Sequence, residues 1–415
     1  MNRRIKAVVA SCAVAATGLA LTGCASDEGG SDSNKLVIAV DLPFTGSSAD
    51  TSESTYNAIS LYLEQIGGKV GDYEIELRKY DNATATAGKW DAAQCKKNAG
   101  DHVASDDEVA VIGPYNSGCA AEMIPVLNQD PDGPLLLVSD ANTAVGLTKK
   151  WDIGEPEKYY PVGTRNYARV VTTDDFQGAA GAQFAVKELG VTNCLVLNDT
   201  EVYGKGVSKT FAAELDEMGI QHTDEAWDGK ATNYNALFNQ AKGVDCVYFG
   251  GVFDNNGAQL LKDKVRILGD NDKVKVITPD GWTGYPDLDA MPEAEGVYGT
   301  FPGLPLADLA ATDKVGTFLD DYQAKYGEAP TSAYALYGTL CLQIILEAIE
   351  ASDGTRADVN AHVLGGDGIT IPADESMVGK EIAIDPATGD VNAIDMTIQI
   401  ITGGEEKALK GWIVE

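Results

Sequence analysis

Small hydroxyl-bearing residues follow two apolar runs of this sequence, at positions where they could hold an anionic group. Ser117 follows the run that ends at Ile112, and Thr143 follows the run that ends at Val138. A hydroxyl beside the free backbone N–H groups and positive dipole of a helix start suits a carboxylate. Ser117 and Thr143 are therefore candidates for holding a ligand carboxylate, although by position alone they could equally cap helices.

A carboxylate and several aromatic residues follow other apolar runs. Asp280 lies in a Pro-Asp-Gly turn, where it could pair with a ligand ammonium group or simply serve the turn. Aromatic residues near predicted strand ends could wall an apolar ligand side chain or belong to the core; they are Tyr115, Tyr203, Phe253 and Trp282. Taken together, the pattern predicts a cleft that binds a zwitterion, with opposite charges held at opposite ends.

The elements that must position these residues alternate along the chain between short apolar runs and longer amphipathic stretches. Strands are expected at residues 36–40, 73–80, 109–112 and 135–138, then at 194–197, 246–249 and 274–277, with closing strands at 396–401 and 409–414. Helices are expected at residues 54–66, 87–103, 120–127, 177–189, 206–218, 234–242 and 258–268, and later at 313–326 and 332–351. Residues 42–52 are expected to form a turn.

The runs are continuously apolar, as strands covered on both faces require. Strand–helix alternation predicts right-handed βαβ units and parallel sheets. Because there are two such series, we predict an α/β fold with two doubly wound parallel-sheet lobes. In such sheets ligands bind beyond the carboxyl ends of the strands, which is where the candidate residues lie.

Composition excludes several classes of function. The 415 residues include 63 Asp and Glu against 31 Lys and Arg, for a formal net charge of −32, which argues against binding nucleic acid or anionic lipid. Only three His occur, and the sequence has no G-x-S-x-G elbow, Walker loop, H-E-x-x-H or C-x-x-C motif. We therefore expect no catalytic residue, metal or cofactor.

The N-terminal segment has the pattern of an export signal. Arg3, Arg4 and Lys6 precede an apolar run, which predicts a secretory signal peptide over residues 1–23. The run ends in Leu-Thr-Gly-Cys, which resembles the bacterial lipobox; this resemblance implies a lipoprotein in which Cys24 is acylated, as with palmitate, and anchors the chain to the cell membrane. Residues 24–34, rich in Ser, Gly and Asp, are expected to form a flexible tether. The body is expected to lie outside the cytoplasm.

Disulfides can form in that compartment, so the cysteines of the body are candidates for pairing. Cys95 and Cys119 lie near the starts of successive predicted helices at the same edge of the sheet, where a bridge would brace the Ser117 turn. Cys194 and Cys246 begin predicted neighbouring strands and could either pair or remain core thiols. Cys341 is expected to be a core thiol.

Six short segments, in their order and spacing, resemble the leucine/isoleucine/valine-binding family, the receptors of branched-chain amino acid ABC importers. They are VIGPYNSG (111–118), SDANTAVGLT (139–148), RVVTTDDFQG (169–178), NDTEVYGKG (198–206), VYFGG (247–251) and TPDGW (278–282). The resemblance implies a type I periplasmic-binding fold with a three-crossing hinge. It places the first lobe at residues 35–168 with 303–383, and the second at 169–302 with 384–415.

The resemblance also implies roles for particular residues. Ser117 and Thr143 would hold the amino-acid carboxylate, and the backbone of Ala141 would receive the ammonium group together with Asp280. Tyr203 would cover the ligand. Tyr115, Trp282 and Phe253 remain candidates for the side-chain pocket. The implied partners are an amino acid and the membrane permease subunits of the transporter, with the receptor itself a monomer.

Two positions depart from the family pattern and leave the ligand open. Residues 49–52 stand where relatives often carry an aromatic residue, and Val252 stands where the aromatic after Y-F-G-G is usual. No strict preference for leucine or valine therefore follows, and a polar amino acid or a small amide is an alternative. Two other functions are alternatives as well: a ligand-sensing receptor of the same fold, and an extracytoplasmic enzyme.

Overall fold

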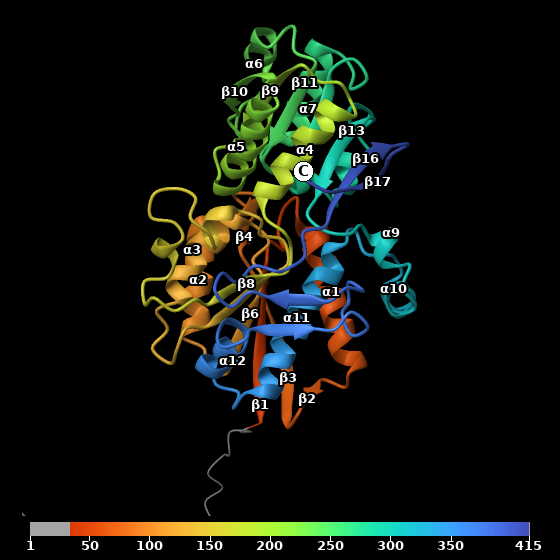
Figure 1. Cartoon of the computed structure of the whole chain (residues 1–415). Coiled ribbons are helices and arrows are strands. Elements are labelled where there is room, and N and C mark those ends of the chain that lie inside the picture. Colours follow the sequence, from red (N-terminus) through yellow and green to blue (C-terminus); the bar gives the residue numbers. More distant parts are fainter. Residues whose placement is uncertain (1–33, 415) are drawn as a thin grey trace, which may run out of the picture. The chain divides into compact units, whose positions relative to one another are not determined.

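The computed structural model describes residues 34–414, which form two mainly parallel β-sheets flanked by helices (Figure 1). The predicted signal peptide (residues 1–23), the predicted lipidation site Cys24 and residues 24–33 of the predicted tether lie outside the described residues. The two sheets correspond to the two predicted strand series.

The first sheet has the strand order β2-β3-β1-β6-β7-β8. Its strands are β1 (Lys35–Leu42), β2 (Lys69–Val70), β3 (Tyr73–Asp81), β6 (Glu108–Ile112), β7 (Leu136–Ser139) and β8 (Tyr167–Arg169). All neighbours are parallel except β2 and β3. Successive residues of β1 enter opposite cores: Ile38 and Val40 pack on one face of the sheet and Ala39 on the other. This explains why these strands are apolar without alternation.

The second sheet has the order β10-β9-β11-β12-β13-β16-β17. Its strands are β9 (Asn193–Asn198), β10 (Gln221–Ala226), β11 (Cys246–Gly250), β12 (Lys275–Thr278), β13 (Val297–Phe301), β16 (Met396–Thr402) and β17 (Glu405–Trp412). The first five are parallel, and β16 and β17 complete the sheet in antiparallel pairing. In Figure 1 the green strands β9 and β11 lie in this sheet, and the blue strands β16 and β17 extend its edge.

Helices cover both faces of each sheet. Packed with the first sheet are α1 (Ala49–Gln65), α2 (Ala92–Val103), α3 (Ser117–Leu127), α10 (Asp313–Tyr326), α11 (Tyr334–Ala351) and α12 (Arg356–Leu364). Packed with the second are α4 (Asp174–Lys187), α5 (Val202–Glu217), α6 (Asn235–Gln240), α7 (Gly257–Leu268) and α8 (Pro286–Asp289). Short elements complete the chain: α9 (Leu306–Leu309), the hairpins β4 (Ala83–Thr84) with β5 (Lys89–Trp90) and β14 (Ile369–Ile371) with β15 (Ile382–Ile384), and 3-10 turns at Val145–Leu147, Glu157–Tyr159, Asp280–Trp282 and Pro292–Ala294.

The chain passes between the two sheets three times: from β8 to α4, from β13 to α9, and from β15 to β16. A buried ion pair joins two of these passages, because Arg169 Nε donates to Asp390 Oδ1 at 2.8 Å. The same guanidinium donates to the carbonyl oxygens of Asn142 (3.0 Å) and Ala144 (2.9 Å). Arg169 therefore ties the crossing to the loop that follows β7.

Among residues 34–414, α11 alone has the length and apolar composition that a membrane-crossing helix would need, and 83% of it is buried within the protein. Its neighbours include α1, α12 and strands of the first sheet. The apolar composition of α11 accordingly matches its place as a core helix.

The predicted helix over residues 87–103 is wrong at its start. Residues 89–90 belong instead to the hairpin β4–β5, and α2 begins at Ala92. The Asp91 side chain sets this boundary, because Oδ1 accepts hydrogen bonds from the N–H groups of Ala93 and Gln94, both at 3.0 Å. Asp91 is thus an N-cap, and the chain before it is free to take another structure.

Four other helices begin three or more residues earlier than predicted. α1 begins at Ala49, so residues 49–52 are helical rather than part of a turn, and α3, α4 and α5 begin at Ser117, Asp174 and Val202. The glycine beside the start of α3 serves close packing, since a Cβ on Gly118 would lie 2.5 Å from the Trp90 ring. Strands β8, β10 and β13 were not predicted. β10 is an edge strand whose polar residues are mostly exposed, so it lacks the apolar signal of a buried strand.

Candidate functional site

A small cavity of about 20 Å³ lies between the two sheets, beyond the carboxyl ends of their strands. Its walls are formed by Tyr115, Asn116, Ser117, Gly118, Ala141, Glu201, Tyr203, Val252, Asp280 and Gly281. Five of the eight predicted ligand-binding residues are among them: Tyr115, Ser117, Ala141, Tyr203 and Asp280. Since about 10–15 Å³ accommodates one water molecule, a larger ligand can enter only when the two sides of the cavity move apart.

One wall of the cavity carries the buried carboxylate of Asp280, in the 3-10 turn after β12. Its Oδ1 accepts hydrogen bonds from the Tyr203 hydroxyl (2.6 Å) and from Gln177 Nε2 (2.7 Å). Its Oδ2 accepts one from the Tyr334 hydroxyl, which belongs to α11 on the side of the first sheet. Asp280 is therefore held from both sheets.

Burial dominates the electrostatics of this wall. Loss of hydration raises the pKa of Asp280 above its ordinary value of 3.8, and the donors Tyr203, Tyr334 and Gln177 oppose the rise only in part. Burial and the adjacent carboxylate also raise the pKa of the Tyr203 and Tyr334 hydroxyls, so both remain hydrogen-bond donors. A cationic ligand group would supply the opposite charge that Asp280 lacks.

The facing wall is built by the start of α3 and by the loop after β7. Ser117 is the first residue of α3, and its hydroxyl accepts a hydrogen bond from the N–H of Ala144 at 3.4 Å. Thr143 is fully buried, and its hydroxyl has no hydrogen-bond partner among residues 34–414. A helix start with nearby hydroxyls and free N–H groups can hold an anion. The cavity thus has a wall suited to holding an anion and a second wall that carries the Asp280 carboxylate.

Three predicted residues do not line the cavity. Thr143 is fully buried and is not among the residues that line the cavity. Trp282 stacks on Phe249 with ring centroids 5.2 Å apart, and Phe253 meets Trp282 at 5.3 Å. Both aromatic residues belong to the core beneath the second sheet's loops, the alternative role that their position also allowed.

Several residues of the site were missed by sequence reasoning. Asn116 and Glu201 lie in the cavity wall, inside segments that were already singled out. Gln177 and Tyr334 bind Asp280 from helices. Glu201 and Asn116 could have been found as polar neighbours of Tyr203 and Ser117. Tyr334 had no local signal, since it begins a helix of the first sheet's core.

The two sides of the cavity are joined by hydrogen bonds and an ion pair. Lys89, on β5, binds the carboxylate of Glu201 and the side-chain oxygen of Asn255. Trp90 Nε1 also donates to Glu201, at 3.1 Å. At another edge, the Ser48 hydroxyl donates to Asp254 Oδ2 at 2.7 Å. The structure therefore presents the cavity in a closed arrangement.

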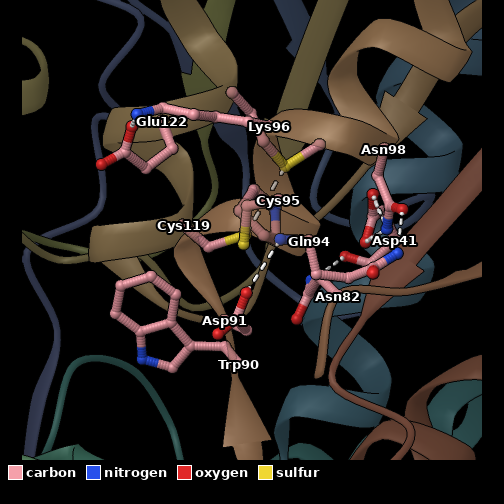
Figure 2. The surroundings of a disulfide bond; sticks show 12 residues. Asp41, Asn82, Trp90, Asp91, Gln94, Cys95, Lys96, Asn98, Cys119 and Glu122 are labelled. Carbon is pink, nitrogen blue, oxygen red and sulfur yellow. Dashed lines mark hydrogen bonds and ion pairs between the residues drawn. A yellow bond between two sulfur atoms is a disulfide. The ribbon is translucent and has the colours of Figure 1, made fainter. Parts of the chain in front are cut away.

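The predicted disulfide between Cys95 and Cys119 is present and joins α2 to α3. Figure 2 shows it beside Trp90 and the Asp91–Gln94 cap bond. The bridge anchors α3 two residues after Ser117, so it braces one wall of the cavity.

The other candidate pair is not bonded, since Cys194 and Cys246 are buried free thiols, as is Cys341. Cys194 and Cys246 are direct partners in the parallel strands β9 and β11. Neighbouring strands lie about 4.7–4.9 Å apart, whereas a disulfide needs Cβ atoms about 3.8 Å apart. The regular strand spacing therefore keeps the two sulfur atoms in separate thiols.

Comparisons with known proteins agree with this geometry. A family model described as periplasmic binding protein matches residues 35–394. A Leu/Ile/Val-binding protein of Rhizobium johnstonii is 28% identical over 355 residues, covering 83% of this chain and 86% of that protein.

Solved structures share the fold. A leucine-binding protein from Thermotoga maritima is 22% identical with a TM-score of 0.72, covering 91% of this chain and 98% of the other. A solute-binding protein of an ABC transporter from Rhodopseudomonas palustris, in complex with 3,4-dihydroxybenzoic acid, is 19% identical with a TM-score of 0.72, covering 92% and 98%. These relatives are solute-binding proteins rather than enzymes. Because the family model spans most of the residues, the chain belongs to the periplasmic binding protein family and has the type I fold of its branched-chain amino acid members.

Proposed function

We propose that this protein is the substrate-binding receptor of an ABC importer and that it binds an amino acid in the cavity between its two sheets. As a periplasmic binding protein it acts outside the cytoplasm and takes up a small solute. The observation that carries the proposal is the opposition of Ser117 at a helix start to the buried carboxylate of Asp280 across one cavity. That arrangement complements a zwitterion, whose carboxylate and ammonium groups lie at opposite ends of a short backbone.

Each ligand group then has a defined partner. The carboxylate lies at the start of α3, against the hydroxyl of Ser117, with Thr143 supporting that wall. The ammonium group pairs with Asp280 and with the backbone at Ala141. Tyr203 donates to Asp280 Oδ1 and borders the cavity, so it covers the bound amino acid. An aromatic acid without an ammonium group would leave the Asp280 carboxylate opposite another anion, which favours an amino acid over such a ligand.

Delivery follows from opening and closing of the two lobes. We assign residues 35–168 with 303–383 to the first lobe and residues 169–302 with 384–415 to the second. The three chain passages between the sheets would act as the hinge. In the closed form the two lobes present one surface to a membrane permease, and an acylated Cys24 would keep the receptor beside it.

The test is calorimetric titration with the common amino acids, followed by the variant Asp280→Ala. Breaking a buried ion pair costs about 3–5 kcal/mol, which is roughly a hundredfold or more in affinity. We expect Asp280→Ala to abolish measurable binding while thermal unfolding remains cooperative. The matched control is Asp308→Ala, which removes an exposed carboxylate and should bind normally. Unchanged affinity in Asp280→Ala would refute the proposal.

A further inference from the structure

Two side chains in the cavity wall, Tyr115 and Asn116, have polar atoms that no residue of the described chain satisfies. Tyr115 is 7% exposed and Asn116 is 6% exposed, and both line the cavity. The Tyr115 hydroxyl and the Asn116 Oδ1 have no hydrogen-bond partner among residues 34–414. A buried polar group without a partner destabilises its surroundings, and a ligand that supplies the partner recovers that loss.

These two groups are separate from those that the proposed zwitterion engages. Ser117 and Asp280 account for the backbone carboxylate and ammonium groups of an amino acid. Asn116 precedes Ser117 as the N-cap of α3, but its side chain makes no capping bond. The Tyr115 ring packs edge-on against Tyr334, with centroids 5.3 Å apart. Tyr115 and Asn116 therefore remain to contact the ligand side chain.

The rest of the wall is poorly suited to an aliphatic side chain. Beyond the tyrosine rings, Val252 is the largest apolar side chain among the lining residues, and Gly118, Gly281 and Ala141 contribute little apolar surface. Glu201 adds a carboxylate. A leucine side chain in this space would cover the Tyr115 hydroxyl and the Asn116 oxygen without bonding either.

The charges around the wall favour a hydrogen-bond donor. Asp280, Asp254 and Asp140 all lie close enough to the Tyr115 hydroxyl to act on it electrostatically. Asp254, which binds Ser48 across the cleft, keeps its Oδ1 without a partner in the described chain. Lys89 is already engaged by Glu201 and Asn255. An N–H group would meet acceptors here, whereas an anionic or acceptor-only group would meet like charge.

We propose that the ligand is an amino acid whose side chain ends in an N–H donor, an amide or an ammonium group, which binds Asn116 Oδ1 and the Tyr115 hydroxyl. This rests on the proposed function and narrows it to a polar amino acid. The absence of an aromatic residue at positions 49–52, and the polar contact of Ser48 with Asp254 beside them, agree with a polar pocket.

The experiment compares two pairs of ligands of equal shape, titrated calorimetrically into the purified protein. In the first pair, leucine carries two methyl groups where asparagine carries an amide. In the second pair, norleucine ends in a methyl group where ornithine ends in an ammonium group. We expect asparagine or ornithine to bind at least about tenfold more tightly than its apolar counterpart, as one satisfied buried donor–acceptor pair implies. The pair that shows the difference identifies the amide or the ammonium form.

The outcomes separate this inference from the function on which it rests. Tighter binding of leucine and norleucine, or equal binding within both pairs, would overturn the side-chain inference and leave amino acid binding intact. Failure of every amino acid to bind would overturn the proposed function, and the inference with it.

The variant Tyr115→Phe removes only the hydroxyl. We expect it to weaken binding of the preferred polar ligand by roughly tenfold and to strengthen binding of its apolar counterpart. The ratio of the affinity for the polar ligand to that for the apolar ligand should therefore fall towards one. Asn116→Leu, a substitution of similar shape, should act in the same direction. The control Tyr73→Phe removes a hydroxyl that binds Asp353 far from the cavity and should keep the ratio. An unchanged ratio in both Tyr115→Phe and Asn116→Leu would overturn the inference.

Discussion

The carboxylate of Asp280 is buried beside three neutral hydrogen-bond donors and has no cation among its hydrogen-bond partners in residues 34–414, which is an unusual environment for an acid. Hydrogen bonds from Tyr203, Tyr334 and Gln177 stabilise its charge, but none of them neutralises it. A buried charge of this kind is costly until an opposite charge arrives. Under the proposed function, pairing with a ligand ammonium group would offset this cost, so Asp280 would favour ligands that carry one.

The raised pKa of Asp280 predicts how binding depends on pH. The ammonium group of the ligand pairs only with the ionised carboxylate, so protonation of Asp280 opposes binding. Affinity should fall as pH is lowered through the raised pKa, that is, at higher pH than a carboxyl with the ordinary value of 3.8 would require.

Calorimetric titration from pH 8 to pH 4 measures this dependence. Asp280→Asn, which keeps the shape but has no charge to titrate, provides the comparison and should show weak binding without the acidic fall. Wild-type affinity that stays constant down to pH 4 would contradict the prediction.

At the scale of elements, α2, α3 and the hairpin β4–β5 form one unit on the first sheet. The disulfide joins the two helices, Asp91 caps α2, and Trp90 packs against Gly118 at the start of α3. Lys89 and Trp90 extend from this unit to Glu201 on the other side of the cavity. The covalent bridge, the wall that bears Ser117 and the contact across the cleft are therefore mechanically connected.

The double variant Cys95→Ala/Cys119→Ala should be less stable and should bind more weakly. Opening a loop with a sequence separation of 24 residues should lower the free energy of unfolding by roughly 2–4 kcal/mol. Chemical denaturation with and without a reductant measures the effect. The reductant should destabilise the wild type and leave the double variant unchanged, because Cys194, Cys246 and Cys341 are free thiols. If the denaturation midpoint of the wild type is the same with and without the reductant, the disulfide does not stabilise the protein.

For the whole molecule, closure rests on a few contacts of unequal strength. Lys89 pairs with Glu201 in a partly buried setting, with 23% and 18% of the two side chains exposed. Lys209 pairs with Asp152 across the same cleft, with 54% and 66% exposed. An exposed ion pair stabilises the closed arrangement by about 0–1 kcal/mol, whereas a partly desolvated pair at the cavity stabilises it by more.

Lys89→Ala should therefore weaken ligand affinity by roughly tenfold, while Lys209→Ala should change it by less than about threefold. Removing Lys89 leaves the Glu201 carboxylate uncompensated at the cavity wall. Small-angle scattering measures the decrease in the radius of gyration when ligand is added. The decrease should be the same in the wild type and Lys209→Ala, and smaller in Lys89→Ala. Equal effects of the two substitutions would show that burial of the pair does not govern closure.

Much of the fold could be predicted because its signals are local. Continuous apolar strands, amphipathic helices and their order along the chain indicated two parallel sheets, and both are present. The rule that ligands bind at the carboxyl ends of parallel strands placed Ser117 and Asp280 in one site before their contacts were known. The polar edge strand β10 and the start of α2 were missed, because one lacks an apolar pattern and the other depends on a single capping side chain.

The sequence by itself determined which side chains stand at the strand ends and which charges they bring to the cavity. Only the tertiary structure decided that Tyr334 holds Asp280 and that Lys89 meets Glu201. It also decided that the Tyr115 hydroxyl and Asn116 Oδ1 have no hydrogen-bond partner among residues 34–414. Strand and helix patterns repeat over a few residues, so they can be recognised in the chain itself. Ser48 and Asp254 are 206 residues apart in the sequence, and their contact depends on how the folded lobes pack together. A pattern that extends over a few residues cannot predict such a contact.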